Sequence, residues 1–186
     1  MNKFDKLEEG CFYHIYNRGN NKENIFYDDS DYAKFTELIK KYLLEYAEFH
    51  SMVLMPNHFH MLIRICLNEP SKVSRQYSNF FNAYTKWFNR KYDRTGSLFT
   101  KRFSRKYIDD ESYLINVICY IHTNPEKHKF VSDFTQWKYN SYHIFHRSGK
   151  SIITRKLVLD LLGEECNSQI AHREYANLIP LKYKVE

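Results

Sequence analysis

Hydrophobic positions along the chain follow two periods, which change from one segment to the next. Short apolar runs bounded by turn residues predict strands, and a 3.6-residue recurrence of apolar positions predicts amphipathic helices. Strands are predicted over residues 11–16, 49–55, 58–66 and 98–108. Helices are predicted after a cap at Ser30 or Asp31, over 71–91, and from a cap at Asp109 or Asp110 to Asn124, before Pro125.

These elements follow the order strand, helix, two strands, helix, strand, helix. Pro56 and Asn57 leave a tight connection between the second and third strands, which should therefore pair antiparallel. The order favours an α+β fold of the ferredoxin-like (split βαβ) type, an antiparallel sheet with helices on one face. Residues 1–145 are predicted to form one domain, and residues 146–186 a short helical C-terminal extension packed on it.

Positive charge is concentrated in one part of the chain. The formal net charge is +6, but residues 70–106 contain ten Lys or Arg and one acid, so this segment has a net charge of +9 and the remainder −3. Clustered Lys and Arg bind polyanions by neutralising phosphates. This uneven distribution favours a nucleic-acid partner over a solvated charged face.

Two histidines separated by one apolar residue, His58 and His60, begin the third predicted strand. Alternate strand residues point to the same face, so the two imidazoles can hold one divalent ion. A pair of this kind is also found as hydrogen-bonded histidines in or near a core. The pair alone therefore leaves both interpretations open.

Tyr120 and Asn124 are four residues apart and share one face of the last predicted helix. Asn124 can offer a third, oxygen ligand beside the tyrosine hydroxyl, or it can simply cap the helix end. The rival tyrosines have no amide side chain four residues further on; they are Tyr92, Tyr107 and Tyr113. Together with the two histidines, this pattern predicts a metal-assisted tyrosine nuclease.

Five motifs in combination resemble the single-tyrosine branch of the HUH transposases, and most of all the REP-associated tyrosine transposases. They are His-Ile-Tyr-Asn-Arg-Gly at 14–19, Met-Pro-Asn-His-Phe-His at 55–60, Gly-Ser-Leu-Phe-Thr-Lys-Arg-Phe at 96–103, Tyr-Ile-His-Thr-Asn-Pro at 120–125 and Trp-Lys-Tyr-Asn-Ser-Tyr at 137–142. The resemblance extends over residues 10–145. The chain departs from it at Glu126, where members of the family often have valine.

The resemblance implies a DNA transposase that cleaves and rejoins single-stranded or hairpin DNA. It implies Tyr120 as the catalytic nucleophile, which forms a 5′-phosphotyrosine intermediate. It also implies a bound Mg²⁺ or Mn²⁺ with three metal ligands, His58, His60 and Asn124. Two alternatives carry the same pattern, namely a replication-initiator or relaxase-type nickase and a catalytically inactive repressor that binds hairpin DNA.

Four basic residues are predicted to contact DNA phosphates: Arg18 in the first loop and Lys101, Arg102 and Arg105 on the fourth predicted strand. The chain has no apolar run suited to a signal peptide or a membrane span, and its four cysteines lack zinc or redox spacing. We therefore expect a cytoplasmic, nucleoid-associated protein without a membrane partner, as a monomer or a homodimer.

Overall fold

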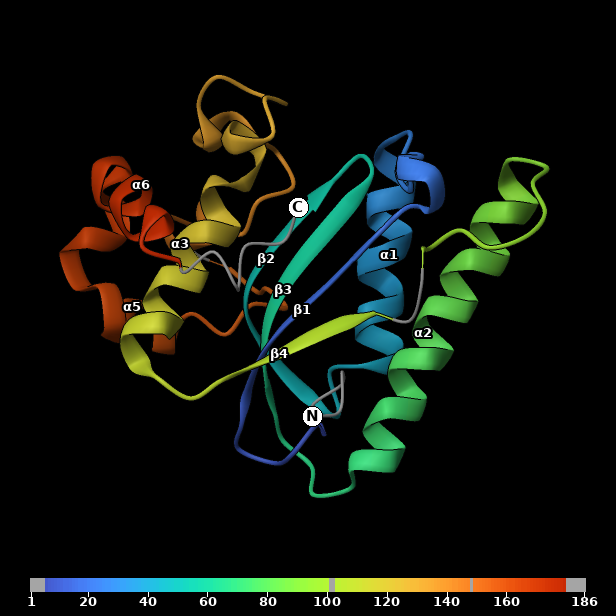
Figure 1. Ribbon diagram of the computed structural model, residues 1–186, viewed down its shortest axis with the longest axis horizontal. Helices are drawn as coiled ribbons and strands as arrows, with labels where there is room; N and C mark the ends of the chain where they lie inside the picture. Colours follow the sequence, from blue (N-terminus) through green and yellow to red (C-terminus); the bar gives the residue numbers. More distant parts are fainter. Residues whose placement is uncertain (1–5, 101–102, 148, 180–186) are drawn as a thin grey trace.

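The computed structural model describes residues 6–100, 103–147 and 149–179 (Figure 1). Within these ranges no helix is both long enough and apolar enough to cross a lipid bilayer. The strands are β1 (Phe12–Arg18), β2 (Ala47–Met55), β3 (His58–Ile65) and β4 (Ser104–Ile108). The helices are α1 (Asp29–Tyr42), α2 (Pro70–Lys91), α3 (Glu111–Lys127), α4 (Tyr142–Phe145), α5 (Lys156–Leu162) and α6 (Gln169–Asn177), with 3₁₀ turns at Asn20–Lys22, Phe134–Gln136 and Gly163–Asn167.

The four strands form one antiparallel sheet in the order β2-β3-β1-β4. A turn at Pro56 and Asn57 joins β2 to β3, so the predicted tight hairpin is present. β1 lies between β3 and β4, which places Tyr16 opposite His60 on one side and Ser104 on the other. The element order and the sheet confirm the predicted α+β class with an antiparallel split-βαβ sheet.

Helices cover both faces of the sheet, so the prediction that they lie on one face is wrong (Figure 1). α1 and α2 pack on the face that carries Phe59, Met61 and Ile63. α3, with α5 and α6, packs on the opposite face, against Leu62 and Val53. The reason lies in β3, whose apolar residues point to both sides. Exposing either face to water would leave large apolar surfaces unburied.

Helix α1 begins slightly earlier than predicted, because its cap is Asp28 and neither Ser30 nor Asp31. The carboxylate of Asp28 accepts a hydrogen bond from the Ser30 amide at 2.9 Å. In return, the carboxylate of Asp31 accepts one from the Asp28 amide at 3.1 Å. This reciprocal capping box satisfies amides that the first helical turn leaves without partners.

Helix α3 begins at the predicted cap, Asp110, whose carboxylate accepts a hydrogen bond from the Tyr113 amide at 2.8 Å. The sequence predicts that this helix ends before Pro125, but it continues to Lys127. Proline lacks an amide hydrogen, which removes one hydrogen bond of the helix without preventing a further turn. That turn is held by the His128 amide, which donates to the Asn124 carbonyl at 2.9 Å. Asn124 is therefore inside the helix and not its cap.

Strand β4 is shorter than the predicted strand over residues 98–108. Only Ser104–Ile108 pairs regularly with β1, while Phe99 forms an isolated bridge with Gly19. A Cβ atom at Gly19 would lie 2.0 Å from the Glu23 carbonyl oxygen, so this close approach requires glycine. Lys101 and Arg102 lie outside the described residues.

The C-terminal helices α5 and α6 pack on the side of α3 that faces away from the sheet (Figure 1). Glu126, the position that departs from the family pattern, joins α3 to α6. Arg173 donates two hydrogen bonds of 2.8 Å to its carboxylate, and the Phe134 amide donates a third at 3.1 Å. The domain boundary after residue 145 stays a prediction.

Breaking the Glu126–Arg173 pair should weaken the docking of α6. Because the Arg173 side chain is 37% exposed, we expect a coupling free energy of only about 0.5 kcal/mol in a double-mutant cycle with Glu126→Ala and Arg173→Ala. Arg173 lowers the pKa of Glu126. The coupling should therefore be present above the unfolded-state pKa of about 4.3 and vanish as pH falls through the lower folded value.

Urea unfolding at pH 7 and at pH 3 measures this coupling. The exposed pair Lys156–Asp160 in α5 is a matched control that should couple less strongly. Equal coupling at both pH values would contradict the assignment.

Candidate active site

His58 and His60 project from β3 to the face that α3 covers. Their ring centroids are 5.4 Å apart, with the ring planes nearly perpendicular at 88°. His60 is buried, whereas His58 is partly exposed. The alternation of the strand thus brings both imidazoles to one face.

Helix α3 brings Tyr120 and Asn124 to the same two histidines. The Tyr120 ring centroid is 5.6 Å from that of His60 and 6.1 Å from that of His14. Asn124 Nδ2 donates to the Tyr120 carbonyl at 3.3 Å, which leaves its side-chain oxygen for another partner. Tyr120 is fully buried, so a phosphate can reach its hydroxyl only after neighbouring side chains move.

Three buried atoms at this site have no hydrogen-bond partner among the described residues: His58 Nε2, His60 Nε2 and Asn124 Oδ1. Each unsatisfied buried polar atom costs about 1–3 kcal/mol, so a ligand that pairs with all three would stabilise this site. Two imidazole nitrogens and an amide oxygen are donors that divalent metal ions accept. The residues present therefore fit a divalent ion.

The other ring nitrogen, Nδ1, of each histidine already has a hydrogen-bond partner. His58 Nδ1 lies 2.6 Å from Asn57 Oδ1, an acceptor, so Nδ1 carries the proton and Nε2 keeps a lone pair. His60 Nδ1 lies 2.9 Å from His14 Nε2. If His60 donates in that bond, its Nε2 also keeps a lone pair. Contacts of this kind fix the tautomer and the ring orientation of metal-binding histidines.

Burial keeps these histidines uncharged. It is the main cause that lowers the pKa of His58 to about 4, that of His14 to about 3, and that of His60 well below its ordinary value. The Asn124 amide lies close enough to His58 to oppose its shift, although the two side chains form no hydrogen bond of good geometry. Near pH 7 all three rings are neutral, which is the form that binds metal ions.

The charged neighbours of these histidines are cationic. Those that lower the histidine pKa values include Arg18, Lys106 and Lys127, and among the described residues no carboxylate contributes to these shifts. A site surrounded by positive charge attracts anions such as phosphates.

Of the basic residues predicted to contact DNA, the two that the structure describes, Arg18 and Arg105, lie on different faces of the sheet. Arg18 lies opposite His58 in the β1–β3 pair, on the face of the site. Arg105 lies opposite Ile15 and therefore faces α2, where its Nη1 donates to Ser74 Oγ at 3.4 Å. Its neighbour Lys106 faces the site instead. Arg105 and Lys106 thus point to opposite faces, and the predicted DNA contacts stay predictions.

Several residues of the site were not predicted from the sequence, among them His14, Lys127 and His128. The Lys127 ammonium lies 4.8 Å from the Tyr120 ring centroid, and the His128 ring lies 4.6 Å from that of His58. Both follow the point at which α3 was predicted to end. His14, Tyr16 and Arg18 are alternate residues of one strand and therefore point to the same face. This alternation is the sequence signal that could have identified His14 as a site residue.

The rival tyrosines lie away from the histidines. The Tyr92 hydroxyl donates to Asp31 at 2.8 Å, Tyr113 packs in the α3 core, and the exposed Tyr107 lies near Tyr13 on the opposite face. A further tyrosine, Tyr16, does lie beside the site, with its ring centroid 5.8 Å from that of His60. An experiment must therefore distinguish Tyr16 from Tyr120 as the candidate nucleophile.

Known proteins are similar to this chain in sequence. The family model described as IS200-like transposase matches residues 8–124. A Haemophilus influenzae protein with the provisional name REP-associated tyrosine transposase is 27% identical over 125 residues, which cover 61% of this chain and 70% of that protein.

Among solved structures, a REP-associated tyrosine transposase bound to a REP hairpin is similar in fold. It superposes with a TM-score of 0.63 at 18% sequence identity, over 83% of this chain and 90% of the other.

Proposed function

The chain belongs to the IS200-like transposase family, and on that premise we propose that it cleaves and rejoins single-stranded or hairpin DNA through a 5′-phosphotyrosine at Tyr120. One observation carries this proposal. The Tyr120 ring lies 5.6 Å from His60, beside three buried donor atoms that lack partners among the described residues. A nucleophile and the ligands of a Lewis acid are thus adjacent.

In the proposed reaction the Tyr120 hydroxyl oxygen attacks the scissile phosphorus. The new bond joins this oxygen to the 5′-phosphate, the bond to the 3′-oxygen breaks, and that oxygen takes up a proton equivalent to the one that Tyr120 loses. Attack by a 3′-hydroxyl on the phosphotyrosine reverses the step and joins strands. Because the covalent link conserves the bond energy, neither ATP nor hydrolysis is needed.

The proposed cofactor is Mg²⁺ or Mn²⁺, with His58 Nε2, His60 Nε2 and Asn124 Oδ1 as ligands. When bound, the ion would polarise the phosphate and offset its negative charge. Imidazole nitrogen suits Mn²⁺ better than Mg²⁺, which prefers oxygen ligands. We therefore expect cleavage to reach half its maximal rate at a lower concentration of Mn²⁺ than of Mg²⁺.

The proposed DNA partner is a hairpin, as in the similar transposase whose structure contains a REP hairpin. Arg18 faces the site from β1 and is the residue we propose for phosphate contact there. Membership of a transposase family favours this function over a replication-initiator nickase. Dimerisation and a cytoplasmic location stay predictions.

Incubation with labelled hairpin DNA in the presence of Mn²⁺ tests the proposal, with hairpin sequences chosen from any short inverted repeats found near the gene. A protein–DNA adduct that survives denaturation, together with a free 3′-hydroxyl, is the expected result. Retarded but uncut DNA would indicate a binding protein without catalysis. Cleavage without an adduct would indicate a nuclease that uses water.

His14 is expected to position His60 for metal binding. Removal of the hydrogen-bond partner in His14→Ala should weaken Mn²⁺ binding about 10–100-fold, and His14→Gln, which keeps an acceptor, should restore part of it. Titration followed by electron paramagnetic resonance measures the affinity without DNA. His50→Ala, which removes another buried histidine of the sheet, is the matched control. Equal losses in His14→Ala and His50→Ala would contradict a specific role.

A further inference from the structure

A buried chain of hydrogen bonds links helix α3 to helix α6, which lies alongside it (Figure 1). At its centre is His122, whose side chain is fully buried. His122 Nδ1 lies 3.1 Å from His172 Nε2 in α6, and His122 Nε2 lies 3.1 Å from Ser141 Oγ. His172 is also fully buried, and its Nδ1 lies 2.9 Å from the Ser168 carbonyl oxygen. None of these four residues takes part in the reaction proposed above.

The direction of each hydrogen bond in this chain follows from the carbonyl group at its end. A carbonyl oxygen only accepts, so His172 Nδ1 carries the proton and His172 Nε2 keeps a lone pair. His122 Nδ1 then donates to that lone pair, which leaves His122 Nε2 to accept from the Ser141 hydroxyl. Burial is the main cause that lowers the pKa of both rings, so both are neutral, as this assignment requires. Loss of one member leaves its neighbour with a buried polar group that has lost its partner.

Ser141 connects the chain to strand β2. The Ser141 amide donates to the Met52 carbonyl at 2.8 Å, and the Met52 amide donates to Ser141 Oγ, also at 2.8 Å. β2 pairs in turn with β3, where Val53 lies opposite His60. His122 is thus connected, through Ser141 and β2, to the strand that carries the histidine pair of the candidate active site.

A second contact holds the backbone of α3 at the same residue. Asn140 Nδ2 donates to the His122 carbonyl at 2.6 Å, and Asn140 Oδ1 accepts from the Tyr142 amide at 3.1 Å. Because Pro125 removes one backbone hydrogen bond from this part of α3, bonds from outside the helix matter more here. Asn140 and its neighbour in the sequence therefore hold one residue of α3 by both its backbone and its side chain.

His122 stands between the two residues that α3 contributes to the candidate active site, two positions from Tyr120 and two from Asn124. Two positions along a helix correspond to a rotation of about 200°, so His122 points away from the side of α3 that carries this pair. A bond to His122 thus holds the helix from behind. A shift of α3 at His122 would move the nucleophile and the proposed metal ligand together.

We propose that His122 and His172 are positioning residues for strand cleavage. The chain that they form holds α3, and with it Tyr120 and Asn124, in place against β3. This inference rests on the proposed function, because it takes Tyr120 as the nucleophile. It gives helix α6 a part in the chemistry, although α6 packs on the side of α3 that faces away from the sheet.

His172→Phe tests the proposal, because it keeps a flat ring beside Phe134 and Tyr142 and removes the acceptor of His122. At saturating hairpin DNA and Mn²⁺, the rate constant of adduct formation should fall on the order of 10–100-fold, since a displacement of about 1 Å has effects of this size. His172→Gln, whose side-chain oxygen can accept in place of Nε2, should restore most of the rate. Hairpin affinity in EDTA should stay unchanged in both variants.

The amplitude of adduct formation separates positioning from a loss of folded protein. An unfolded fraction lowers the amount of adduct per chain, whereas a displaced α3 lowers the rate constant. Val158→Ala is the matched control, since it removes buried methyl groups from the same core and takes no part in the chain. It should lower the midpoint of urea unfolding and keep the wild-type rate constant. Equal rate constants in His172→Phe and Val158→Ala overturn the proposal.

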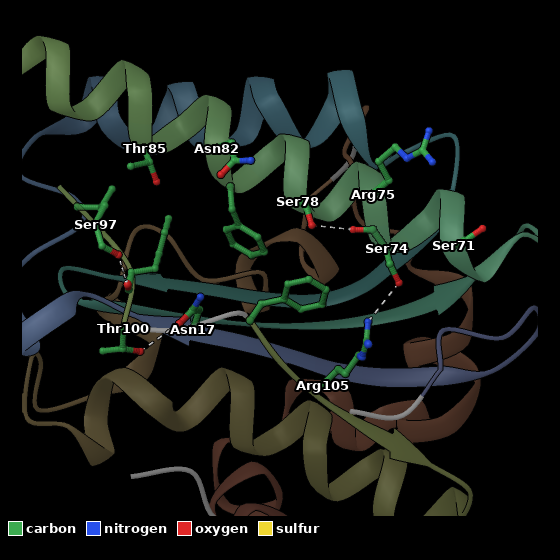
Figure 2. A pocket seen from close by; sticks show the side chains of 14 residues that line it. Asn17, Ser71, Ser74, Arg75, Ser78, Asn82, Thr85, Ser97, Thr100 and Arg105 are labelled. Carbon is green, nitrogen blue, oxygen red and sulfur yellow. Dashed lines mark hydrogen bonds between the residues drawn. The ribbon is translucent and has the colours of Figure 1, made fainter. Parts of the chain in front are cut away.

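Ser141→Ala removes the donor to the other nitrogen of the same ring, so it should lower the rate constant as well. Because both changes act through His122, Ser141→Ala combined with His172→Phe should cost little more than one of them alone. Ser74→Ala is the control, since it removes a serine hydroxyl bonded to Arg105 on the opposite face of the sheet (Figure 2). A double variant whose loss equals the product of the two single losses overturns the common route through His122.

Adduct formation by the wild type distinguishes the failure of this proposal from that of the proposed function. If the wild type, His172→Phe and Ser141→Ala all form adducts equally fast, only the positioning proposal is overturned. If His172→Phe does not fold, the rate constant of Ser141→Ala decides alone. If the wild-type chain forms no adducts, the proposed function fails and this inference fails with it.

Discussion

Tyr120→Phe is expected to abolish the covalent protein–DNA adduct and to lower strand cleavage by at least about 10⁴-fold, because it removes the attacking oxygen and nothing else. The phenyl ring can still occupy its buried place beside His60. Affinity for hairpin DNA should therefore stay within a few fold of the wild type. Denaturing electrophoresis with labelled DNA measures the adduct, and anisotropy measures the affinity.

Tyr16→Phe is the control for this experiment, since its ring also lies beside His60. It should form adducts at a rate near that of the wild type. Adducts in Tyr120→Phe that disappear in Tyr16→Phe would transfer the role of nucleophile to Tyr16. Mass spectrometry of the nucleotide-linked peptide gives the same answer independently.

His58→Ala and His60→Ala should each lower cleavage on the order of 10³-fold or more, and EDTA should do the same to the wild type reversibly. The loss corresponds to the several kcal/mol of transition-state stabilisation that a catalytic metal ion supplies. Each variant removes one of the ring nitrogens without a partner among the described residues, so Mn²⁺ affinity should fall together with the rate. Rate measurements over a series of Mn²⁺ concentrations test both effects.

Partial recovery at high Mn²⁺ would indicate that the lost side chain acted as a ligand, since excess metal compensates for weaker binding. Asn124→Ala should recover at a lower Mn²⁺ concentration than His60→Ala, because an amide oxygen is the weaker ligand. Undiminished cleavage after thorough chelation would refute the metal assignment.

Local periodicity was sufficient to predict the parts of the site that lie within single elements. The alternation of β3 put His58 and His60 on one face, and the helical period put Tyr120 beside Asn124. The turn at Pro56 and Asn57 likewise determined how β2 and β3 pair. Each of these inferences concerns residues that the backbone holds close together.

Contacts between distant elements could not be predicted in this way. The bond between His14 and His60 depends on the register of β1 against β3, which no short turn determines. Lys127 and His128 lie beyond the helix end that Pro125 predicts, because a hydrogen bond from the His128 amide to the Asn124 carbonyl extends α3 past the proline. Arg105 and Lys106 were grouped by charge, while the alternation of β4 points them to opposite faces.

The alternation of β1 divides its residues between the candidate site and the core of the opposite face. Even-numbered positions such as His14 and Arg18 face the site, whereas Tyr13 and Ile15 belong to the core that α1 and α2 cover. Insertion of one residue within the strand would exchange the two sets, so it should disrupt the site and the core together. A point substitution changes one set alone, so the chemistry of the site and the stability of the fold can be varied separately only by substitution.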